Sequence, residues 1–480
     1  MAFCYTYLGH MPIEALVSWG NDLLWSRLLI VMLIGAGLYF TVRSNFVQFR
    51  MLKEMLRVVT DLSHGPSGQG ISSFGAFCIG AASRIGTGNL AGVALAIAVG
   101  GPGAVFWMWV IALLGAASAF VESTLAQIYK VPDGQQFRGG PAYYMEKALG
   151  QRWMGILFAI LITFTFGLVF SSVQANTISL AFESAYGVPR IVLAILLTVF
   201  TAMVIFGGVQ RISKVAQVLV PVMAVVYVVM ALYIMIINFT QIPAVFWLII
   251  SDAFGLREAA GGGIGAALSQ GIRRGLFSNE AGMGSAPNAA ATASVSHPVK
   301  QGLVQTLGVF TDTLLVATAT AFIILFSGLY DTEEASGITL TQDALGTQIG
   351  GWAPSFIAVA ILMFAFSSII GNYYYGETNT EFITDDRRWI FYYRVAVLGL
   401  VFFGSLAELE LVWALADLFM GSMAIVNLIA IVLLGRIAFA ALRDYLRQRR
   451  AGEDPTFHVD NIQGLKNVEC WGESNRPKVR

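Results

Sequence analysis

One apolar stretch, residues 82–103, combines the hydrophobicity of a membrane span with a run of residues that breaks a helix. It reads ASRIGTGNLAGVALAIAVGGPG, and Gly86, Thr87, Gly88 and Asn89 interrupt it. In hydrocarbon every backbone N–H and C=O needs a partner, so an unwound segment persists only where protein encloses it or where it lines a wet cavity. The break therefore predicts a binding site. Its glycines admit a ligand close to the backbone, and the N-terminus of the half-helix that follows suits a carboxylate.

The composition is typical of a protein that crosses the bilayer many times. The 480 residues are 56% hydrophobic and 12% charged, and the mean hydropathy is +0.70. Soluble domains carry about twice that share of charged residues. The formal net charge is zero, so no nucleic-acid partner is indicated, and the lipid bilayer is the expected surrounding.

Hydropathy predicts an all-α polytopic membrane protein with about 11 transmembrane helices, each of about 20 apolar residues. The predicted spans are residues 22–42, 71–99, 103–126, 153–181, 190–207, 214–238, 264–292, 301–327, 355–380, 389–406 and 411–436. The 264–292 span is rich in small residues and the first span carries Arg27. Both are kept because losing either would reverse the charge pattern of every loop beyond it.

Basic residues set the predicted orientation, because cytoplasmic loops collect Lys and Arg. With the N-terminus outside, the basic residues of the first loop and of the tail fall on the cytoplasmic side. They are Arg43, Arg50, Lys53, Arg57, Arg436, Arg443, Arg447, Arg449 and Arg450. We predict an extracytoplasmic N-terminus (1–21), a transmembrane transporter domain (22–436) and a cytoplasmic tail (437–480) in a plasma or inner membrane. The loop 44–70, with its HGPSGQG motif, and the tail are expected to be connectors without a core of their own.

A second stretch repeats the interrupted pattern. From Gly261 the sequence is GGGIGAALSQGIRRGLFSNEAGMGSAPNAAATA, in which Asn279, Glu280, Gly282 and Gly284 indicate a break. When the first helix is set aside, ten spans remain, and the interrupted ones are the first and the sixth. Breaks at matching positions of two halves are typical of transporters built from inverted repeats, with substrate and ion sites at mid-membrane.

Five runs make the chain resemble the alanine or glycine:cation symporters, also called sodium:alanine symporters. They are GTGNLAGVALAIAVGGPGAVFWMW (86–109), QQFRGGPAYYM (135–145), VQAN (173–176), SNEAGMGSAPNAAATA (278–293) and FAFSSIIGNYYYGE (364–377). The resemblance implies a fold like that of the bacterial leucine transporter: one N-terminal helix plus a five-plus-five inverted repeat with broken first and sixth core helices. It also implies a secondary transporter, not an enzyme. Such a protein imports small neutral amino acids, alanine or glycine, by alternating access, with Na+ as the co-transported ion and not a prosthetic group.

The resemblance further implies where the amino acid binds. The family holds the substrate carboxylate near the first break, which here means Thr87, Gly88 and Asn89. The alternative, glycines that only pack helices, usually shows GxxxG spacing. Gln174 in the fourth span is either a substrate ligand or one end of a hydrogen bond between helices. Phe277, just before the second break, is expected to form a wall of the pocket, although a core position is the default for any Phe.

Two adjacent hydroxyls in the ninth span, Ser367 and Ser368, are candidate sodium ligands, because hard cations take oxygen ligands. Likeness to the leucine transporter adds the carbonyls of Ala82 and Ile85, and Ser368 is also a candidate substrate contact. The alternative is ordinary serine bonding to the preceding helical turn. Asn372 stands where relatives carry a larger aromatic residue. It therefore implies a roomier or more polar pocket and leaves a strict preference for alanine or glycine open.

Ionisable residues inside a span are costly and indicate function by default. Glu280 lies in the second break and Asp312 lies between two threonines, so both are candidates for an ion or proton path. Three arginines near the breaks are candidates for ion pairs that gate the site: Arg84, Arg273 and Arg274. The sequence does not show which residues they pair with. Two further ionisable residues within the spans are Glu122 and Glu377. They lie near predicted cytoplasmic ends of helices, so we expect them to have interfacial structural roles.

Three other functions stay open at this point. A proton-coupled amino-acid symporter would have the same fold. A membrane-embedded hydrolase needs a nucleophile beside a base, but no His lies next to a Ser within a predicted span. A passive channel would show no saturation. The sequence does not decide among alanine, glycine and serine, between D and L enantiomers, or the ion stoichiometry and oligomeric state.

Overall fold

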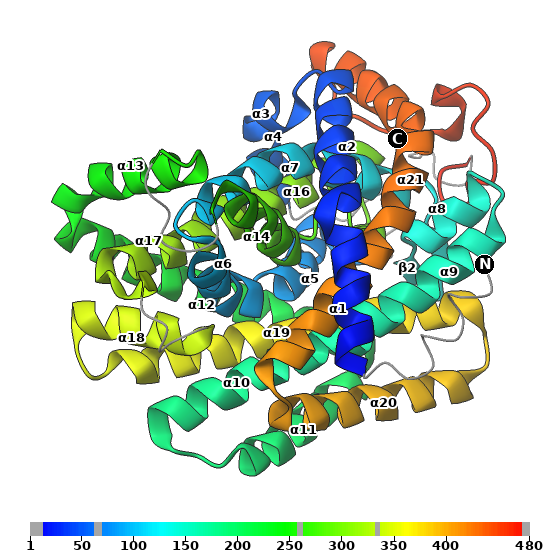
Figure 1. The fold of residues 1–480 in the computed structure, drawn as a ribbon. Coiled ribbons are helices and arrows are strands. Elements are labelled where there is room, and N and C mark those ends of the chain that lie inside the picture. Colours follow the sequence, from blue (N-terminus) through cyan, green and yellow to red (C-terminus); the bar gives the residue numbers. More distant parts are fainter. Residues whose placement is uncertain (1–12, 62–69, 257–262, 332–336, 473–480) are drawn as a thin grey trace, which may run out of the picture.

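The computed structural model describes residues 13–61, 70–256, 263–331 and 337–472. Over these residues the protein is a nearly all-helical bundle, which confirms the predicted fold class (Figure 1). A two-stranded antiparallel hairpin joins β1 (Val131–Asp133) to β2 (Gln136–Arg138). Residues 1–12 of the predicted N-terminal segment and residues 62–69 of the 44–70 loop lie outside the described residues.

Within the described residues, eight helices are long and apolar enough to cross a membrane. They are α1 (Ile13–Leu23) continued by η2 (Leu24–Leu28) and α2 (Leu29–Arg43); α7 (Ala104–Ile128); α9 (Arg152–Ile162) continued by η4 (Thr163–Phe170) and α10 (Ser171–Tyr186); α12 (Gly208–Ile237); α16 (Pro298–Val309) continued by η6 (Phe310–Ala317) and α17 (Thr318–Ser327); α19 (Ala353–Ile383); α20 (Arg387–Leu406); and α21 (Leu409–Arg450). Each corresponds to a span predicted from hydropathy.

The remaining three predicted spans are shorter or interrupted. The 71–99 span is a pair of helices bent by 49°, α5 (Ser73–Arg84) followed by η3 (Gly88–Gly92) and α6 (Val93–Gly100). The 264–292 span is divided into α14 (Gly263–Asn279) and α15 (Ala286–Ala291). The 190–207 span is α11 (Arg190–Ile205), which has only 16 residues. Both predicted breaks are therefore confirmed.

Several short elements connect or cover these helices. They are α3 (Val47–Arg50), α4 (Leu52–Val59), α8 (Pro141–Lys147), η5 (Phe239–Gln241), α13 (Ile242–Ala253), η7 (Leu329–Asp331), α18 (Ile338–Ile349) and η8 (Val459–Asn461). Hydropathy predicted neither α13 nor α18, because both have 12 residues and are too short for a span. α18 packs against α10, α17 and α19, and so fills a side of the bundle.

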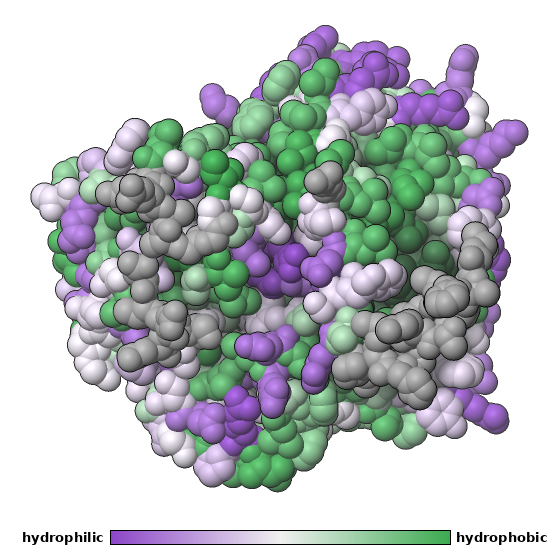
Figure 2. All heavy atoms as spheres, viewed as in Figure 1, coloured by the Kyte–Doolittle hydropathy of each residue, from purple (hydrophilic) through white to green (hydrophobic). Residues whose placement is uncertain are grey.

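The outer surface is hydrophobic where lipid would lie. Large side chains on α12 and α20 are more than half exposed, among them Val218, Val225, Phe391 and Tyr392. Such a surface is rare on soluble monomers but is expected where a protein contacts acyl chains. In Figure 2 hydrophobic residues cover much of one face, while hydrophilic residues gather at the top, where α21 ends.

The two broken spans lie side by side. α5 packs against α12, α16 and α19, and α6 packs against α14. Just before α5 begins, the Ile71 N–H donates to the Thr292 carbonyl (3.2 Å), and the Ser294 N–H donates to the Ile71 carbonyl (2.8 Å). The beginning of the first broken span is thus joined to the end of the second.

The tail folds back onto the bundle. α21 continues to Arg450, well past the predicted end of the last span at 436. Beyond it, Phe457 and Trp471 are buried against the helix ends, and the Phe457 N–H donates to the Ser296 carbonyl at 2.9 Å. Among the described residues, the tail adds to the main core and forms no core of its own.

Candidate functional site

The first break is a tight turn held by side-chain amides. The Gly86 N–H donates to Asn89 Oδ1 (3.1 Å), and the Thr87 N–H donates to Gln174 Oε1 (2.9 Å). A Cβ at Gly86 would overlap Ser368 Oγ and would lie 2.9 Å from Gln174 Oε1. Only glycine therefore fits at position 86. The free backbone donors of this break are capped by neutral groups, and the residues are fully buried.

An aromatic layer covers the η3 end of this break. A Cβ at Gly88 would lie 2.9 Å from Phe277 Cδ1, so the backbone and the ring are in direct contact. The Phe277 ring packs between Phe170 of η4 and Trp413 of α21, with centroid distances of 4.5 and 4.7 Å. Phe277 thus lies beside the break in the position that a pocket wall requires.

Asp312 of η6 joins the two broken spans. Its carboxylate accepts hydrogen bonds from Asn89 Nδ2 (2.7 Å), Ser278 Oγ (2.7 Å) and Thr313 Oγ1 (2.8 Å). Asn89 Nδ2 also lies 3.2 Å from Ser278 Oγ. The carboxylate is fully buried, and these three partners are neutral. The guanidinium of Arg84 acts on this carboxylate from a distance, but none of its three hydrogen-bond partners is a cation. A buried carboxylate without a directly bonded cation is costly, so this is a group that a cation or a proton would neutralise.

The second break is capped by a carboxylate. Glu280, Gly282 and Gly284 have positive φ angles of 58°, 84° and 90°. Glu122 of α7 accepts the Gly282 N–H at 3.1 Å, and Asn427 Nδ2 of α21 donates to Glu122 Oε2 at 2.8 Å. Glu122, which was expected to have an interfacial structural role, does form structural contacts. Its side chain is fully buried and holds the second break, because α7 packs along α14 and α15.

Glu280 extends from the second break to the first broken span. Its carboxylate accepts hydrogen bonds from Ser83 Oγ of α5 (2.7 Å) and Ser285 Oγ (2.6 Å). Ser83 Oγ also lies 2.8 Å from Asn372 Oδ1 of α19. Asn372 Nδ2 is buried and has no hydrogen-bond partner among the described residues. Glu280 and Asn372 therefore lie together at the α5 end of the first break, whereas Phe277 lies at its η3 end.

The two adjacent serines of α19 face different neighbours. Ser368 Oγ donates to the Ala82 carbonyl of α5 at 2.8 Å. Ser367 Oγ donates to a carbonyl of its own helix, that of Phe364 (2.8 Å), and lies 3.7 Å from Met223 Sδ of α12. Among the predicted sodium ligands, Ser368 and Ala82 are thus in contact. Ile85 is buried at the turn itself, and Ser367 faces α12.

The three candidate gate arginines lie in two places. Arg84 is buried, and its Nη1 donates to the Gln305 carbonyl of α16 at 3.3 Å. Arg273 and Arg274 instead both pair with Asp417 of α21, and the Arg274 guanidinium lies 4.6 Å from the centroid of the Trp413 ring. The Asp417 ion pairs therefore lie next to the aromatic layer. The last intramembrane acid, Glu377, pairs with Arg394 at 2.8 Å.

Sequence reasoning missed four residues of this site. Asp417 lies inside the predicted 411–436 span, so its charge was a usable signal, but its arginine partners are far away in sequence. Ser83 and Ser278 immediately flank the two breaks. Asn427 gave no signal, because an Asn in an apolar span has many roles and its contact with Glu122 depends on the packing of α7 against α21.

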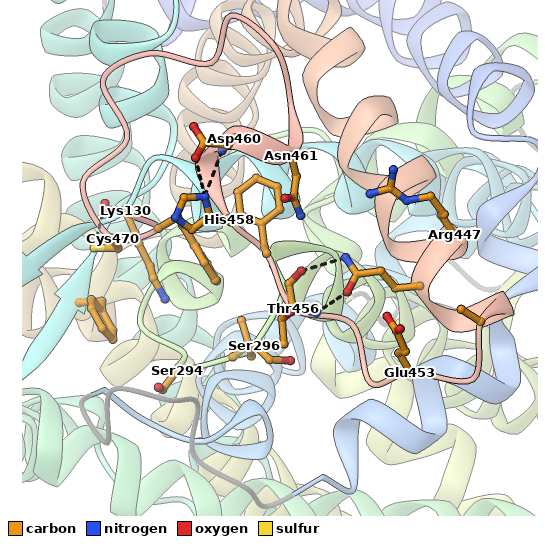
Figure 3. Close-up of a pocket in the computed structure, with 16 residues that line it drawn as sticks. Lys130, Ser294, Ser296, Arg447, Glu453, Thr456, His458, Asp460, Asn461 and Cys470 are labelled. Carbon is orange, nitrogen blue, oxygen red and sulfur yellow. Dashed lines mark hydrogen bonds and ion pairs between the residues drawn. The ribbon is translucent and has the colours of Figure 1, made fainter. Parts of the chain in front are cut away.

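Two cavities of the described residues lie away from both breaks. One of about 690 Å³ is enclosed by the tail, the hairpin and the 294–296 loop, and Figure 3 shows Lys130 and Arg447 on opposite sides of it. Lys130 Nζ donates to the Ala293 carbonyl (2.8 Å) and lies 4.0 Å from the centroid of the Phe137 ring. Burial lowers the pKa of Lys130 to about 7. This pocket shares no lining residue with the predicted site.

A solved structure shares the fold. The crystal structure of MhsT in complex with L-phenylalanine matches with a TM-score of 0.53 at 15% sequence identity, over 78% of this chain and 96% of that one. The fold is of the leucine-transporter type, and the family model makes the chain a multi-pass membrane transporter and not an enzyme. The chain belongs to the sodium:alanine symporter family, whose sequence model matches residues 10–459.

Two relatives from Bacillus subtilis are similar over nearly the whole chain. The probable sodium/glutamine symporter GlnT is 58% identical over 96% of this chain and 97% of its own length. The amino-acid carrier protein AlsT is 56% identical over 96% of this chain and 98% of its own length. The protein is thus an integral membrane amino-acid symporter, which confirms the predicted transporter class and the expected family.

Proposed function

We propose that the protein imports small neutral amino acids, first of all alanine and glycine, together with Na+, by alternating access around the first break. The observation that carries this proposal is the neutral capping of that break. The N–H groups of Gly86 and Thr87 donate to side-chain amides at 3.1 and 2.9 Å. A substrate carboxylate is a stronger acceptor than an amide oxygen, so it displaces these caps without leaving a buried donor unpaired.

The sodium ion is proposed to bind where α19 contacts α5. The Ser368 hydroxyl lies 2.8 Å from the Ala82 carbonyl, and both are oxygen ligands of the kind a hard cation prefers. An ion held between these helices favours the conformation in which they stay together. Because the amino acid binds at the same break, it favours that conformation too, and coupling follows from this shared preference.

Two layers enclose the proposed site, and alternating access requires them to open in turn. On one side lie the aromatic layer around Phe277 and the ion pairs of Asp417. On the other side Glu280 bonds Ser83 and Ser285. We propose that the first layer faces outside and the second faces the cytoplasm. This orientation, with the N-terminus outside and the tail inside, agrees with the basic residues beyond the end of the last span.

Uptake into proteoliposomes tests both the substrate and the ion. We expect labelled alanine to accumulate, with saturation, when an inward Na+ gradient is imposed, and unlabelled glycine to compete. Replacing Na+ by choline should abolish accumulation. Accumulation that persists in choline and follows an inward proton gradient would overturn sodium coupling, and would favour the buried carboxylates of Asp312 and Glu280 as proton carriers. Uptake that neither saturates nor concentrates would overturn symport.

Glutamine is a second candidate substrate, and one feature of the site favours it. The buried amide of Asn372 contacts Ser83 Oγ through one end only, and its other end can form a hydrogen bond with a substrate side-chain amide. The relative GlnT, named a probable sodium/glutamine symporter, agrees with this assignment. We expect unlabelled glutamine to inhibit alanine uptake in the wild type, and Asn372→Ala to weaken that inhibition more than alanine uptake itself. Absence of inhibition at high glutamine concentrations would remove this candidate.

A further inference from the structure

A basic cleft opens on the side of the molecule that carries the tail. It has a volume of about 710 Å³ and lies between the α8–α9 corner, the last turns of α21 and the tail residues 462–467. Its charged lining residues are all cationic: Lys147, Arg436, Arg443 and Lys466. No carboxylate lines this cleft, so it presents a single sign of charge to a ligand.

Most of this positive charge is unpaired. Lys147 forms an ion pair with Glu469. The side chains of Arg436, Arg443 and Lys466 are exposed and take part in no ion pair of the described residues. The backbone around them is fixed, because Asn467 Nδ2 donates to the Lys147 carbonyl at 2.9 Å and so holds the tail to the α8–α9 corner. Three free cations therefore face a cleft of defined shape.

One helix stripe connects this cleft to the lipid-facing surface. On α21, Ile429, Leu433, Arg436, Ala440 and Arg443 follow one another at spacings of four and three, which places them on the same face of the helix. Ile429 and Leu433 are 45% and 59% exposed. The stripe is thus apolar within the span and cationic beyond it. This is the order in which acyl chains and a headgroup are arranged in a bilayer leaflet.

The neighbouring helix continues the apolar surface. α9 packs against α21 (Figure 1), and its outer residues Trp153, Leu157 and Ile160 are 65%, 39% and 43% exposed. Trp153 stands at the start of α9, close to the corner residues 148–150 that line the cleft. Aromatic residues of this kind are common at the level of the headgroups.

We propose that this cleft binds the headgroup of an anionic phospholipid, whose acyl chains lie along the apolar part of the α21 stripe beside α9. The unpaired cations supply the recognition of the phosphate, and the continuous apolar stripe selects a lipid over a free phosphate compound. A bound lipid also bridges the tail, α21 and the α8–α9 corner. It should therefore stabilise the folded protein, whatever the substrate and the coupling ion are.

Lipid retention by the purified full-length protein tests this site. The protein is reconstituted in phosphatidylcholine vesicles with and without phosphatidylglycerol, extracted, and examined by native mass spectrometry and thermal melting. The cleft variant carries Arg436→Gln, Arg443→Gln and Lys466→Gln. The control variant carries Arg50→Gln, Lys53→Gln and Arg387→Gln, which remove the same charge from exposed positions that do not line the cleft. We expect phosphatidylglycerol to be retained and to raise the melting temperature in the wild type and in the control.

The cleft variant should lose at least tenfold in retained phosphatidylglycerol and should melt at the same temperature in both lipid mixtures. Equal retention by the cleft and control variants would overturn the proposal, because the lipid would then follow net charge and not a site. A third arm adds inorganic phosphate or glycerol 3-phosphate to the protein in phosphatidylcholine. If either compound gives the same stabilisation, and Leu433→Ala leaves lipid retention unchanged, the ligand is a soluble phosphate and the lipid assignment is overturned.

Discussion

The two broken spans satisfy their free backbone groups in different ways. In the first break the N–H groups of Gly86 and Thr87 donate to neutral amides, whereas in the second the Gly282 N–H donates to the carboxylate of Glu122. A hydrogen bond between neutral groups contributes roughly 0.5–1.5 kcal/mol, and the Glu122 carboxyl group accepts two hydrogen bonds at once, from the Gly282 N–H and from Asn427 Nδ2. The first break can therefore exchange its caps for a ligand at lower cost, while the second is held more firmly to its neighbours.

The two breaks also differ in which neighbouring helices hold them. The second break is tied to α7 by Glu122 and to α21 by Asn427, whose Nδ2 also donates to the Gly282 carbonyl at 2.9 Å. The first is closed by Gln174 of α10 and is contacted by Ser368 of α19. The comparison predicts that substitutions at the first break change ligand binding, and that substitutions at the second change the stability of the fold.

Gly86→Ala should have the largest effect on transport. The added methyl group overlaps Ser368 Oγ and approaches Gln174 Oε1, so the turn has to shift, and misplaced binding groups cost on the order of 100-fold in rate. We expect alanine uptake in proteoliposomes to fall by that factor. Gly399→Ala on α20 is the control, because a Cβ there meets no atom within 4 Å. Similar uptake by both variants would mean that the first break does not form the site.

Removing each kind of cap in turn tests the comparison between the two breaks. Glu122→Ala leaves the Gly282 N–H and the Asn427 amide without their carboxylate, which costs about 1–3 kcal/mol for each buried donor. It should lower the melting temperature strongly. Gln174→Ala should leave the protein folded. It should raise the dissociation constant for alanine about tenfold, because the amide that the substrate displaces from the Thr87 N–H is proposed to bond the substrate instead, and one such hydrogen bond is worth about 1.4 kcal/mol. The reverse pattern, with Gln174→Ala unfolding the protein and Glu122→Ala weakening only binding, would exchange the roles of the two breaks.

Ser368→Ala should act on the ion more than on the amino acid. It removes a hydroxyl that lies 2.8 Å from the Ala82 carbonyl, so we expect the sodium concentration for half-maximal uptake to rise several-fold, by about 3- to 10-fold for the loss of one ligand. Ser367→Ala is the matched comparison, since this hydroxyl faces Met223, and should have the smaller effect. A larger effect of Ser367→Ala would place the ion on the α12 side of α19.

A substitution at Lys130, which bonds the Ala293 carbonyl just after the second broken span, should have the smallest effect, and that effect is on stability. Burial lowers its pKa from 10.5 to about 7, so between these values the unfolded chain holds a proton that the folded protein has released. Stability therefore rises with pH across that window, and below pH 7 this group destabilises the fold by an amount that no longer changes with pH. Lys130→Met should flatten the rise in melting temperature between pH 7 and 10 by on the order of a few °C. The exposed Lys53→Met should not, and parallel curves for all three proteins would contradict the shift.

Local composition was enough to predict eight membrane-length helices and both breaks. Glycines and small polar residues that interrupt an apolar run leave few alternatives in a bilayer, so Gly86 and Gly282 were found from the sequence. Family resemblance supplied Gln174, Phe277 and Ser368, and the structure brings these residues to the first break. Their binding roles stay predictions.

Long-range partners were beyond such reasoning. Asp417 pairs with arginines more than 140 positions away, and Glu122 caps a break 160 positions further along the chain. Such contacts depend on which helices pack together, and hydropathy does not contain that information. The same holds for the tail. Its polar composition predicted a connector, but Phe457 and Trp471 bury themselves against the helix ends.

Equilibrium binding of labelled alanine to the purified protein, in Na+ and in choline, tests most directly the claim that one break holds both amino acid and ion. Measured without a membrane gradient, it separates binding from transport. We expect Na+ to lower the dissociation constant for alanine at least tenfold in the wild type, and Ser368→Ala to shift this dependence to higher Na+ concentrations. The same dissociation constant in Na+ and in choline would contradict the account.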